Sequence, residues 1–167
     1  MKKILSLTLV LAMLGTALTG CGSKNTAAQT PAENTQQTAP VQQEQSQTEK
    51  ALALINTFAT GDTDTARSLL ADGYIQHNLA YGTGADAFIG SVEYLASAEV
   101  KTTVNNIRAF EDGDKVFLQT IYNFAGAGEQ VAFDIFRFDE NGKIAEHWDV
   151  METIADQSTW QNQNGKF

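Results

Sequence analysis

A histidine and an aspartate stand two residues apart near the end of the chain, in the segment Glu146-His147-Trp148-Asp149. The surrounding residues, 143–152, have the β-branched and aromatic content of a strand, and successive strand residues point to opposite faces. An imidazole and a carboxylate on one face can hold and transfer protons. The expected face of this pair contains Ala145, His147, Asp149 and Met151, and the opposite face contains Ile144, Glu146, Trp148 and Val150.

A third ionisable residue, Asp134, lies on the strand predicted just before this one. If the hairpin closes with Phe138 opposite Lys143, Asp134 lies directly across from His147. A register that differs by one residue places Asp134 opposite Trp148 instead. We favour the first register, because it gathers the polar side chains in one place.

Unreactive roles are open for the same residues. His147 and Asp149 could brace the strand as a satisfied pair, and Asp134 could position the hairpin. His77, which follows a predicted helix, could be a turn residue that is partly in solvent. Each of these interpretations competes with an acid/base site.

A metal centre is a weaker interpretation of the sequence. His77, His147 and Asp149 would make a set of two histidines and one carboxylate, but they lack the paired spacing of a metal motif. The chain has no glycine-rich phosphate loop and no nucleophile elbow for Ser/His/Asp catalysis. We therefore expect neither a metal nor a bound cofactor.

The elements that must position these residues begin with helices. Apolar residues recur at helical spacing in the first half of the folded region, with glycines and capping residues between them. The expected elements are a helix over 51–59 stopped by Gly61, a second helix capped by Asp62 or Thr63 that buries Leu70 and ends at Gly73, a short extended or turn segment over 74–78, and a third helix over 85–97.

The pattern then changes to that of strands, and turn signals separate the apolar runs. Strands are expected over 100–110, 115–124, 131–138 and 143–152, with turns at 111–114, at 126–128 and, most clearly, at Asp139-Glu140-Asn141-Gly142. Helices followed by an antiparallel meander indicate an α+β domain in which helices cover one face of a sheet.

Composition limits the function. The chain has 167 residues with 11 Lys+Arg and 20 Asp+Glu, a formal net charge of −9. This charge excludes a protein that coats DNA or RNA, because neutralising phosphates requires basic patches. A single cysteine excludes an internal disulfide and any multi-cysteine metal site.

The first residues are typical of a targeting signal. Lys2 and Lys3 precede the apolar run 4–18, which is short for a membrane-spanning helix. Leu18-Thr19-Gly20-Cys21 resembles the lipobox of bacterial lipoproteins, and this resemblance implies cleavage before Cys21 and lipidation of its thiol. An ordinary secretory signal with a chance cysteine is the alternative. Lipidation would anchor the protein on the extracytoplasmic face of a bacterial membrane.

The chain therefore divides into four parts. These are a signal peptide at 1–20, a Gln/Thr/Ala-rich tether at 21–49 that is expected to be disordered, a folded domain at 50–154, and a polar tail at 155–167.

The folded domain resembles the SnoaL-like family of the nuclear transport factor two-like superfamily. Two stretches carry the resemblance, namely 74–78 and the longer Asp134–Asp149 segment around the hairpin, whereas Leu79 departs from a common proline. The resemblance implies a cone-like fold with a largely apolar pocket, frequent homodimers, and relatives that are cofactor-free polyketide cyclases with a pocket aspartate as acid/base.

These observations lead to one functional hypothesis and one rival. The hypothesis is a membrane-anchored protein that binds a small, mostly apolar or carbonyl-containing molecule and performs cofactor-free acid/base chemistry on it. The rival is a non-catalytic module for ligand binding or dimerisation. The residues in the proposed roles are Asp149 as acid/base with His147 and Asp134 in support, His77 or Asn78 as donor to the substrate oxygen, and Tyr122, Phe136 and Trp148 as ligand contacts, the last two having core packing as their alternative.

Overall fold

The structure is a computed structural model that describes residues 44–167, so the expected signal peptide, Cys21 and most of the tether lie outside the described residues. No helix within the described part is both long enough and apolar enough to cross a membrane. The described residues form one compact unit.

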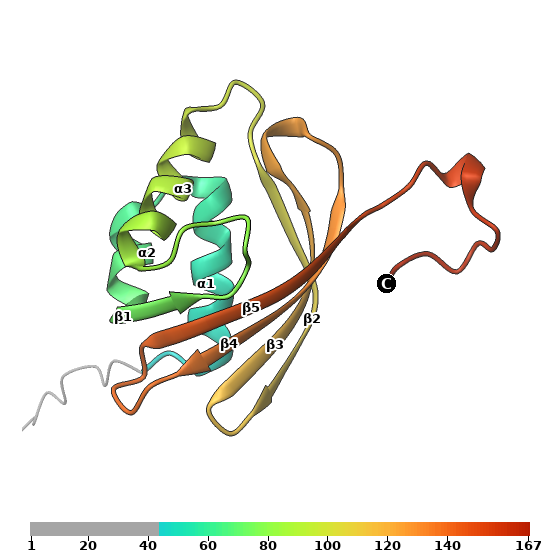
Figure 1. The fold of residues 1–167 in the computed structure, drawn as a ribbon. Coiled ribbons are helices and arrows are strands. Elements are labelled where there is room, and N and C mark those ends of the chain that lie inside the picture. The colour runs from blue at the N-terminus through green and yellow to red at the C-terminus, as the bar shows by residue number, and fades with distance from the viewer. Residues whose placement is uncertain (1–43) are drawn as a thin grey trace, which may run out of the picture. The chain divides into compact units, whose positions relative to one another are not determined.

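Three helices cover one side of the sheet, as Figure 1 shows. Helix α1 begins inside the expected tether, because Ser46 and Glu49 form a capping box in which each side chain accepts the other's backbone N–H. Gly61 ends α1 as predicted. The helices are α1 (Gln47–Thr60), α2 (Thr63–Leu69) and α3 (Ala85–Ser97), the last with the bounds expected from sequence.

Gly61 permits both a chain reversal and close helix packing. Its φ of 74° is left-handed, and a Cβ added there would lie 2.8 Å from Cβ of Ala96 on α3. We expect Gly61→Ala to lower the free energy of unfolding by about 1–3 kcal/mol, measured by urea denaturation. Gly73→Ala is the control, because a Cβ there meets nothing within 4 Å. Equal losses in the two variants would contradict this account.

The second helix is shorter than predicted. It ends at Leu69, and β1 (Leu70–Gln76) begins at once, whereas the sequence indicated a helix that continues to Gly73. Leu70 is buried as expected, but in extended backbone, because it pairs in parallel with Ile144 at the edge of the sheet. Pairing with a distant strand thus overrides the local helical pattern.

The sheet has five strands in the order β1-β5-β4-β3-β2, and every neighbouring pair except β1 and β5 is antiparallel. This arrangement confirms the predicted α+β cone. The remaining elements are β2 (Thr103–Asp112), β3 (Lys115–Asn123), the short helix η1 (Phe124–Gly126), β4 (Gln130–Phe138), β5 (Ile144–Thr153) and η2 (Gln157–Thr159) in the otherwise irregular tail.

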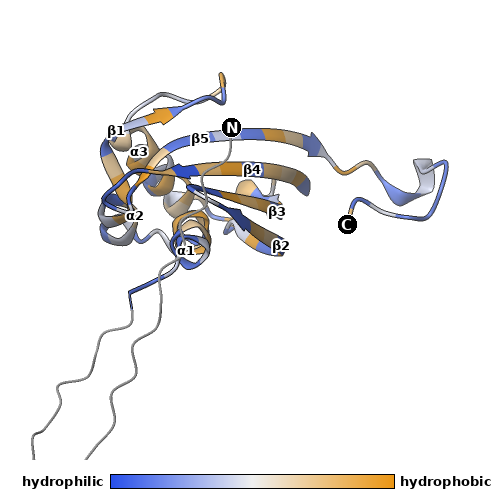
Figure 2. Cartoon of the chain, turned by 90° about the horizontal axis from the view of Figure 1, so that it is seen from below, coloured by the Kyte–Doolittle hydropathy of each residue, from blue (hydrophilic) through white to orange (hydrophobic). Residues whose placement is uncertain are grey.

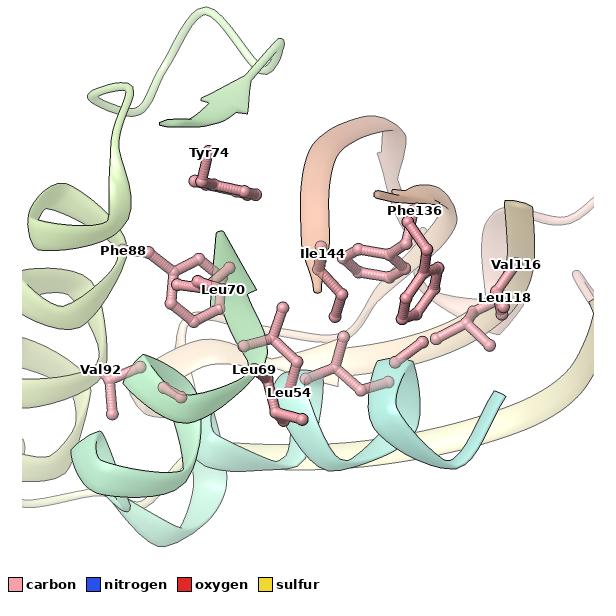
Figure 3. Packing of buried hydrophobic residues seen from close by; sticks show 14 of the residues in the cluster. Leu54, Leu69, Leu70, Tyr74, Phe88, Val92, Val116, Leu118, Phe136 and Ile144 are labelled. Atoms are coloured by element: carbon pink, nitrogen blue, oxygen red, sulfur yellow. The ribbon is translucent and has the colours of Figure 1, made fainter. Parts of the chain in front are cut away.

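The hydrophobic core lies between the helices and the sheet. Figure 2 shows apolar stretches interrupted by polar residues along the strands, and buried strand residues such as Leu118 and Phe136 belong to one core cluster with residues of the helices. Figure 3 shows Leu54 of α1 and Phe88 of α3 extending toward Phe136 and Ile144 of the sheet. Phe136 and Ile144 are both fully buried.

The hairpin between β4 and β5 differs from both predicted registers. Phe138 pairs with Ile144 rather than with Lys143, which is the alternative register at the turn. The register then shifts by one more residue at Ala145, so Asp134 lies opposite Asp149, and neither His147 nor Trp148 is its direct partner. This β-bulge also explains why Ile144, expected on the outer face, is buried together with Ala145.

Candidate active site

A narrow cavity opens between α1, α3 and the inner face of the sheet. The space in which a water-sized molecule can be centred is about 50 Å³, and the total empty space including the open mouth is about 550 Å³. Most of the lining is aromatic or aliphatic, and one wall carries ionisable groups. The lining residues are Phe58, Tyr74, Gln76, Tyr81, Gly82, Phe88, Ser91, Leu95, Tyr122, Phe124, Asp134, His147, Asp149 and Met151.

The structure brings Asp134, His147 and Asp149 together in this wall. The alternation along β5 predicted that His147 and Asp149 share a face, whereas the register from which Asp134 was expected to join them is not the one observed. His147 Nε2 lies 3.1 Å from Asp134 Oδ1 and 4.0 Å from Asp149 Oδ2. The three side chains are at most 8% exposed. Asp134 and His147 are diagonal neighbours on adjacent strands, so the bulge preserves their contact although it changes the register.

Both oxygens of Asp134 accept hydrogen bonds. Tyr122 Oη donates to Oδ2 at 3.0 Å, and His147 Nε2 is in contact with Oδ1. Tyr122 therefore lines the cavity, as expected, but it also holds a carboxylate. Burial and the charge of Asp134 raise the pKa of Tyr122 well above its usual value, so the phenol keeps its proton.

Gln76 determines which nitrogen of His147 carries the proton. The backbone N–H of Asn78 donates to Gln76 Oε1 at 2.9 Å, which fixes the orientation of the amide. Gln76 Nε2, a donor, then lies 3.0 Å from His147 Nδ1. Nδ1 must accept this bond, so the neutral imidazole carries its proton on Nε2 and donates to Asp134.

Gln76→Glu is expected to add a proton at Nδ1 while Nε2 keeps its proton toward Asp134, which gives an imidazolium between two carboxylates. The glutamate retains an acceptor for Asn78 but presents an oxygen to His147 Nδ1, which then becomes protonated. Nitrogen-15 NMR of the imidazole would show an unprotonated Nδ1 in the unmodified protein and a protonated one in the variant. A protonated Nδ1 in both proteins would refute the assignment to Gln76.

Asp149 is the carboxylate with a free oxygen. Asn78 Nδ2 donates to Oδ1 at 2.7 Å, while Oδ2 accepts no hydrogen bond from the described residues. Burial raises the pKa of Asp149 above its ordinary value, and the nearby charge of Asp134 adds to this increase against the opposing effects of His147 and Asn78. Asp149 is thus suited to exchange a proton with a bound molecule.

The same three residues are the only set within 44–167 whose ligand atoms could surround a metal ion. The set weighed from sequence, which included His77, is not assembled. Coordination by His147 Nε2 would require the proton to move to Nδ1, where it would face the N–H of Gln76. The hydrogen-bond network therefore favours proton transfer over metal binding.

His77 and Trp148 lie away from the cavity, contrary to the roles expected for them. Their rings stack on each other with centroids 4.5 Å apart, and His77 Nε2 lies 3.7 Å from Glu146 Oε1. Glu146 and Trp148 alternate with His147 along β5, so they occupy the outer face of the sheet. Neither ring can reach a ligand in the cavity.

Phe136 and Asn78 contact the ionisable residues of the site without lining the cavity: Phe136 contacts His147, and Asn78 contacts Asp149. Phe136 is fully buried and stacks on the His147 ring, with centroids 4.3 Å apart. Neither residue lines the cavity, so the expected ligand contact of Phe136 is replaced by core packing. Sequence reasoning missed Gln76 and Tyr74, although both lie in the stretch 70–78 and their alternation would have placed them on one face once that stretch was known to be a strand.

Comparison with known proteins identifies the family. The SnoaL-like domain model matches residues 51–147, more than half of the chain. No curated protein matches the chain.

Several solved structures share the fold. An NTF2-like protein of unknown function from Cytophaga hutchinsonii is 16% identical, with a TM-score of 0.57 and coverage of 67% of this chain and 95% of that one. IdmH, a proposed polyketide cyclase from Streptomyces antibioticus, is 18% identical, with a TM-score of 0.52 and coverage of 65% and 93%. An LEH-like epoxide hydrolase from Mycobacterium tuberculosis is 18% identical, with a TM-score of 0.56 and coverage of 64% and 82%. The family match and the shared fold together show that this chain belongs to the SnoaL-like domain family.

Proposed function

We propose that the cavity binds a neutral carbonyl compound and that Asp149 removes a proton from the carbon next to the carbonyl group. One observation carries the proposal: Asp149 has one oxygen fixed by Asn78 and the other unbound in a mostly apolar cavity. Burial raises its pKa, which makes the carboxylate a stronger base than one in water.

Tyr74 is the proposed donor to the substrate oxygen, in place of His77 or Asn78. Its oxygen accepts a hydrogen bond from Gln76 at 3.2 Å, and its own O–H has no acceptor among the described residues. Burial, together with the charges of Asp149 and Asp134, raises the pKa of Tyr74, so it remains a donor. An enolate oxygen beside it would be stabilised by that O–H.

The proposed reaction is balanced within the site. Asp149 takes the α-proton, the C–H electron pair forms a C=C bond, and the carbonyl electrons move to the oxygen held by Tyr74. The proton can return to carbon, or the enolate can attack a second carbonyl in an aldol reaction. A cyclase-type role is supported by the family and by the proposed polyketide cyclase among the neighbours.

Exchange of α-protons for deuterium tests the proposal without a known substrate. The purified protein is mixed with simple linear and cyclic ketones in D₂O, and proton NMR follows loss of the α-proton signals. Exchange faster than in buffer supports the proposal. Binding without exchange would instead favour a non-catalytic ligand-binding module.

We also propose that Cys21 anchors the protein to the extracytoplasmic face of a membrane. Support comes from the lipobox-like Leu18–Cys21 and the preceding apolar run. Mass spectrometry of the protein from a bacterial membrane fraction should find an N-terminal lipidated Cys21. Unchanged membrane association of Cys21→Ser would contradict the proposal.

A homodimer through the outer face of the sheet is a further proposal. Large apolar side chains are exposed on that face at Phe117, Phe133 and Val150. Phe133 and Val150 are direct partners in the sheet and form one patch. Sedimentation equilibrium should find a dimer for the unmodified protein and a monomer for Phe133→Asp, and a monomer in both cases would exclude this interface.

A further inference from the structure

A second groove adjoins the mouth of the cavity, between α3 and the short helix η1. Four residues, namely Tyr81, Ser91, Leu95 and Phe124, line both spaces, so the groove continues outward from the cavity. It is larger than the cavity, with about 540 Å³ in which a water-sized molecule can be centred and about 1010 Å³ including its open side. Its remaining lining residues are Ala87, Gly90, Tyr94, Ala125 and Ala127.

The composition of the groove points to a neutral, apolar occupant. All of its lining residues are uncharged, and five of them are small, namely Ala87, Gly90, Ser91, Ala125 and Ala127. The adjoining cavity carries the carboxylates Asp134 and Asp149, and neither space is lined by any lysine or arginine among residues 44–167. An anionic ligand would be repelled without compensation, whereas a hydrocarbon chain gains by leaving water.

We infer that the ligand has two parts: a narrow carbonyl-bearing head in the cavity and an uncharged apolar tail in the groove. The groove follows α3 from Ala87 to Tyr94, which corresponds to about 10 Å of helix. The substrate class is therefore a neutral ketone or ester with a tail of several carbons, and free carboxylic acids and phosphates are disfavoured. This inference rests on the proposed function, because the head is placed beside Asp149.

Gly90 allows the groove to be filled without disturbing the cavity. It lies within α3, does not line the cavity, and a Cβ added there meets nothing within 4 Å. Gly90→Leu should therefore occupy the groove while the helix remains intact. Gly90→Ala is the matched control, because it makes the same backbone change and leaves most of the space free.

Calorimetric titration of the purified protein with linear methyl ketones of four to ten carbons tests the inference. We expect affinity to rise about twofold to fourfold per methylene, with fourfold corresponding to full burial. In Gly90→Leu, the affinity for the ten-carbon ketone should fall at least about tenfold, and the affinity for the four-carbon ketone should change by no more than about twofold. In Gly90→Ala, affinity should still rise with chain length. Carboxylic acids of the same lengths should bind more weakly than the ketones.

The outcomes separate this inference from the proposed function. The assignment of the ligand's tail to the groove is overturned if affinity does not depend on chain length, or if that dependence is unchanged in Gly90→Leu. This holds even if ketones still exchange their α-protons. A length dependence lost in Gly90→Leu supports the groove even if no ketone exchanges protons, in which case only the catalytic proposal fails. Tighter binding of the carboxylic acids would overturn the assignment of a neutral ligand.

Discussion

Replacing Asp149 by Asn is expected to slow α-proton exchange of a bound ketone by about a thousandfold, while ketone affinity changes only a few-fold. Asparagine has the shape of aspartate and retains an oxygen for Asn78, but it cannot accept a proton from carbon. General-base catalysis contributes roughly 10²–10⁴-fold in enzymes, and no second carboxylate with a free oxygen lines the cavity among the described residues. The measurement is the exchange rate in D₂O at saturating ketone.

Glu146→Gln is the matched control. Glu146 lies on the same strand but on the outer face, where it pairs with Arg137. Its amide variant should exchange α-protons at the rate of the unmodified protein. Equal rates in Asp149→Asn and the unmodified protein would remove Asp149 from the mechanism.

The stability of Asp149→Asn provides an independent readout. Because the folded-state pKa of Asp149 is raised, the folded chain binds more protons than the unfolded chain between the ordinary pKa and the raised one. Stability therefore falls as pH rises through that window, and at neutral pH the ionised Asp149 is destabilising. Asp149→Asn should be at least as stable as the unmodified protein at neutral pH, with the difference shrinking in acid. A variant that is markedly less stable at neutral pH would contradict the assigned environment.

Phe136→Ala is expected to lower the free energy of unfolding by about 3–5 kcal/mol, measured by urea denaturation. Phe136 is fully buried, and its ring supports the imidazole of His147. The truncation leaves a cavity in the core and removes the surface on which His147 stacks. The variant should also lose most of its α-proton exchange at temperatures where it remains folded, because the polar network is no longer held in place.

Phe133→Ala is the matched control for Phe136→Ala, because it makes the same change on the same strand at a side chain outside the core. Phe133 lies one residue before Asp134 on the same strand, but its side chain is 55% exposed on the outer face. Its truncation should cost less than about 1 kcal/mol in the monomer. Similar losses for the two phenylalanines would mean that Phe136 is not the core residue described above.

The fold was predictable from the sequence wherever a pattern is local. The helix at 85–97 has its apolar residues at regular helical spacing, and the hairpin turn at 139–142 contains a strong turn sequence. The edge strand β1 was not predictable, because Leu70 continues the apolar pattern of α2 and only its partner Ile144, more than seventy positions away, makes it a strand.

The site was predictable in part for the same reason. Alternation along β5 places His147 and Asp149 on one face, and this depends only on neighbouring residues. The partners of these residues depend on distant pairing. Gln76 reaches His147 because β1 runs parallel to β5, whereas His77, one position further, falls on the opposite face.

The bulge at Ala145 has a consequence for the transfer of residue assignments within the family. It is equivalent to an insertion of one residue into β5 relative to β4, because the strand on either side of it still pairs. A relative without the insertion would carry its equivalents of His147 and Asp149 one position nearer to the turn. Counting from Asn141-Gly142 in such a relative would assign the proposed acid/base role to a side chain on the wrong face, so homologous residues should be matched by their partners in β4.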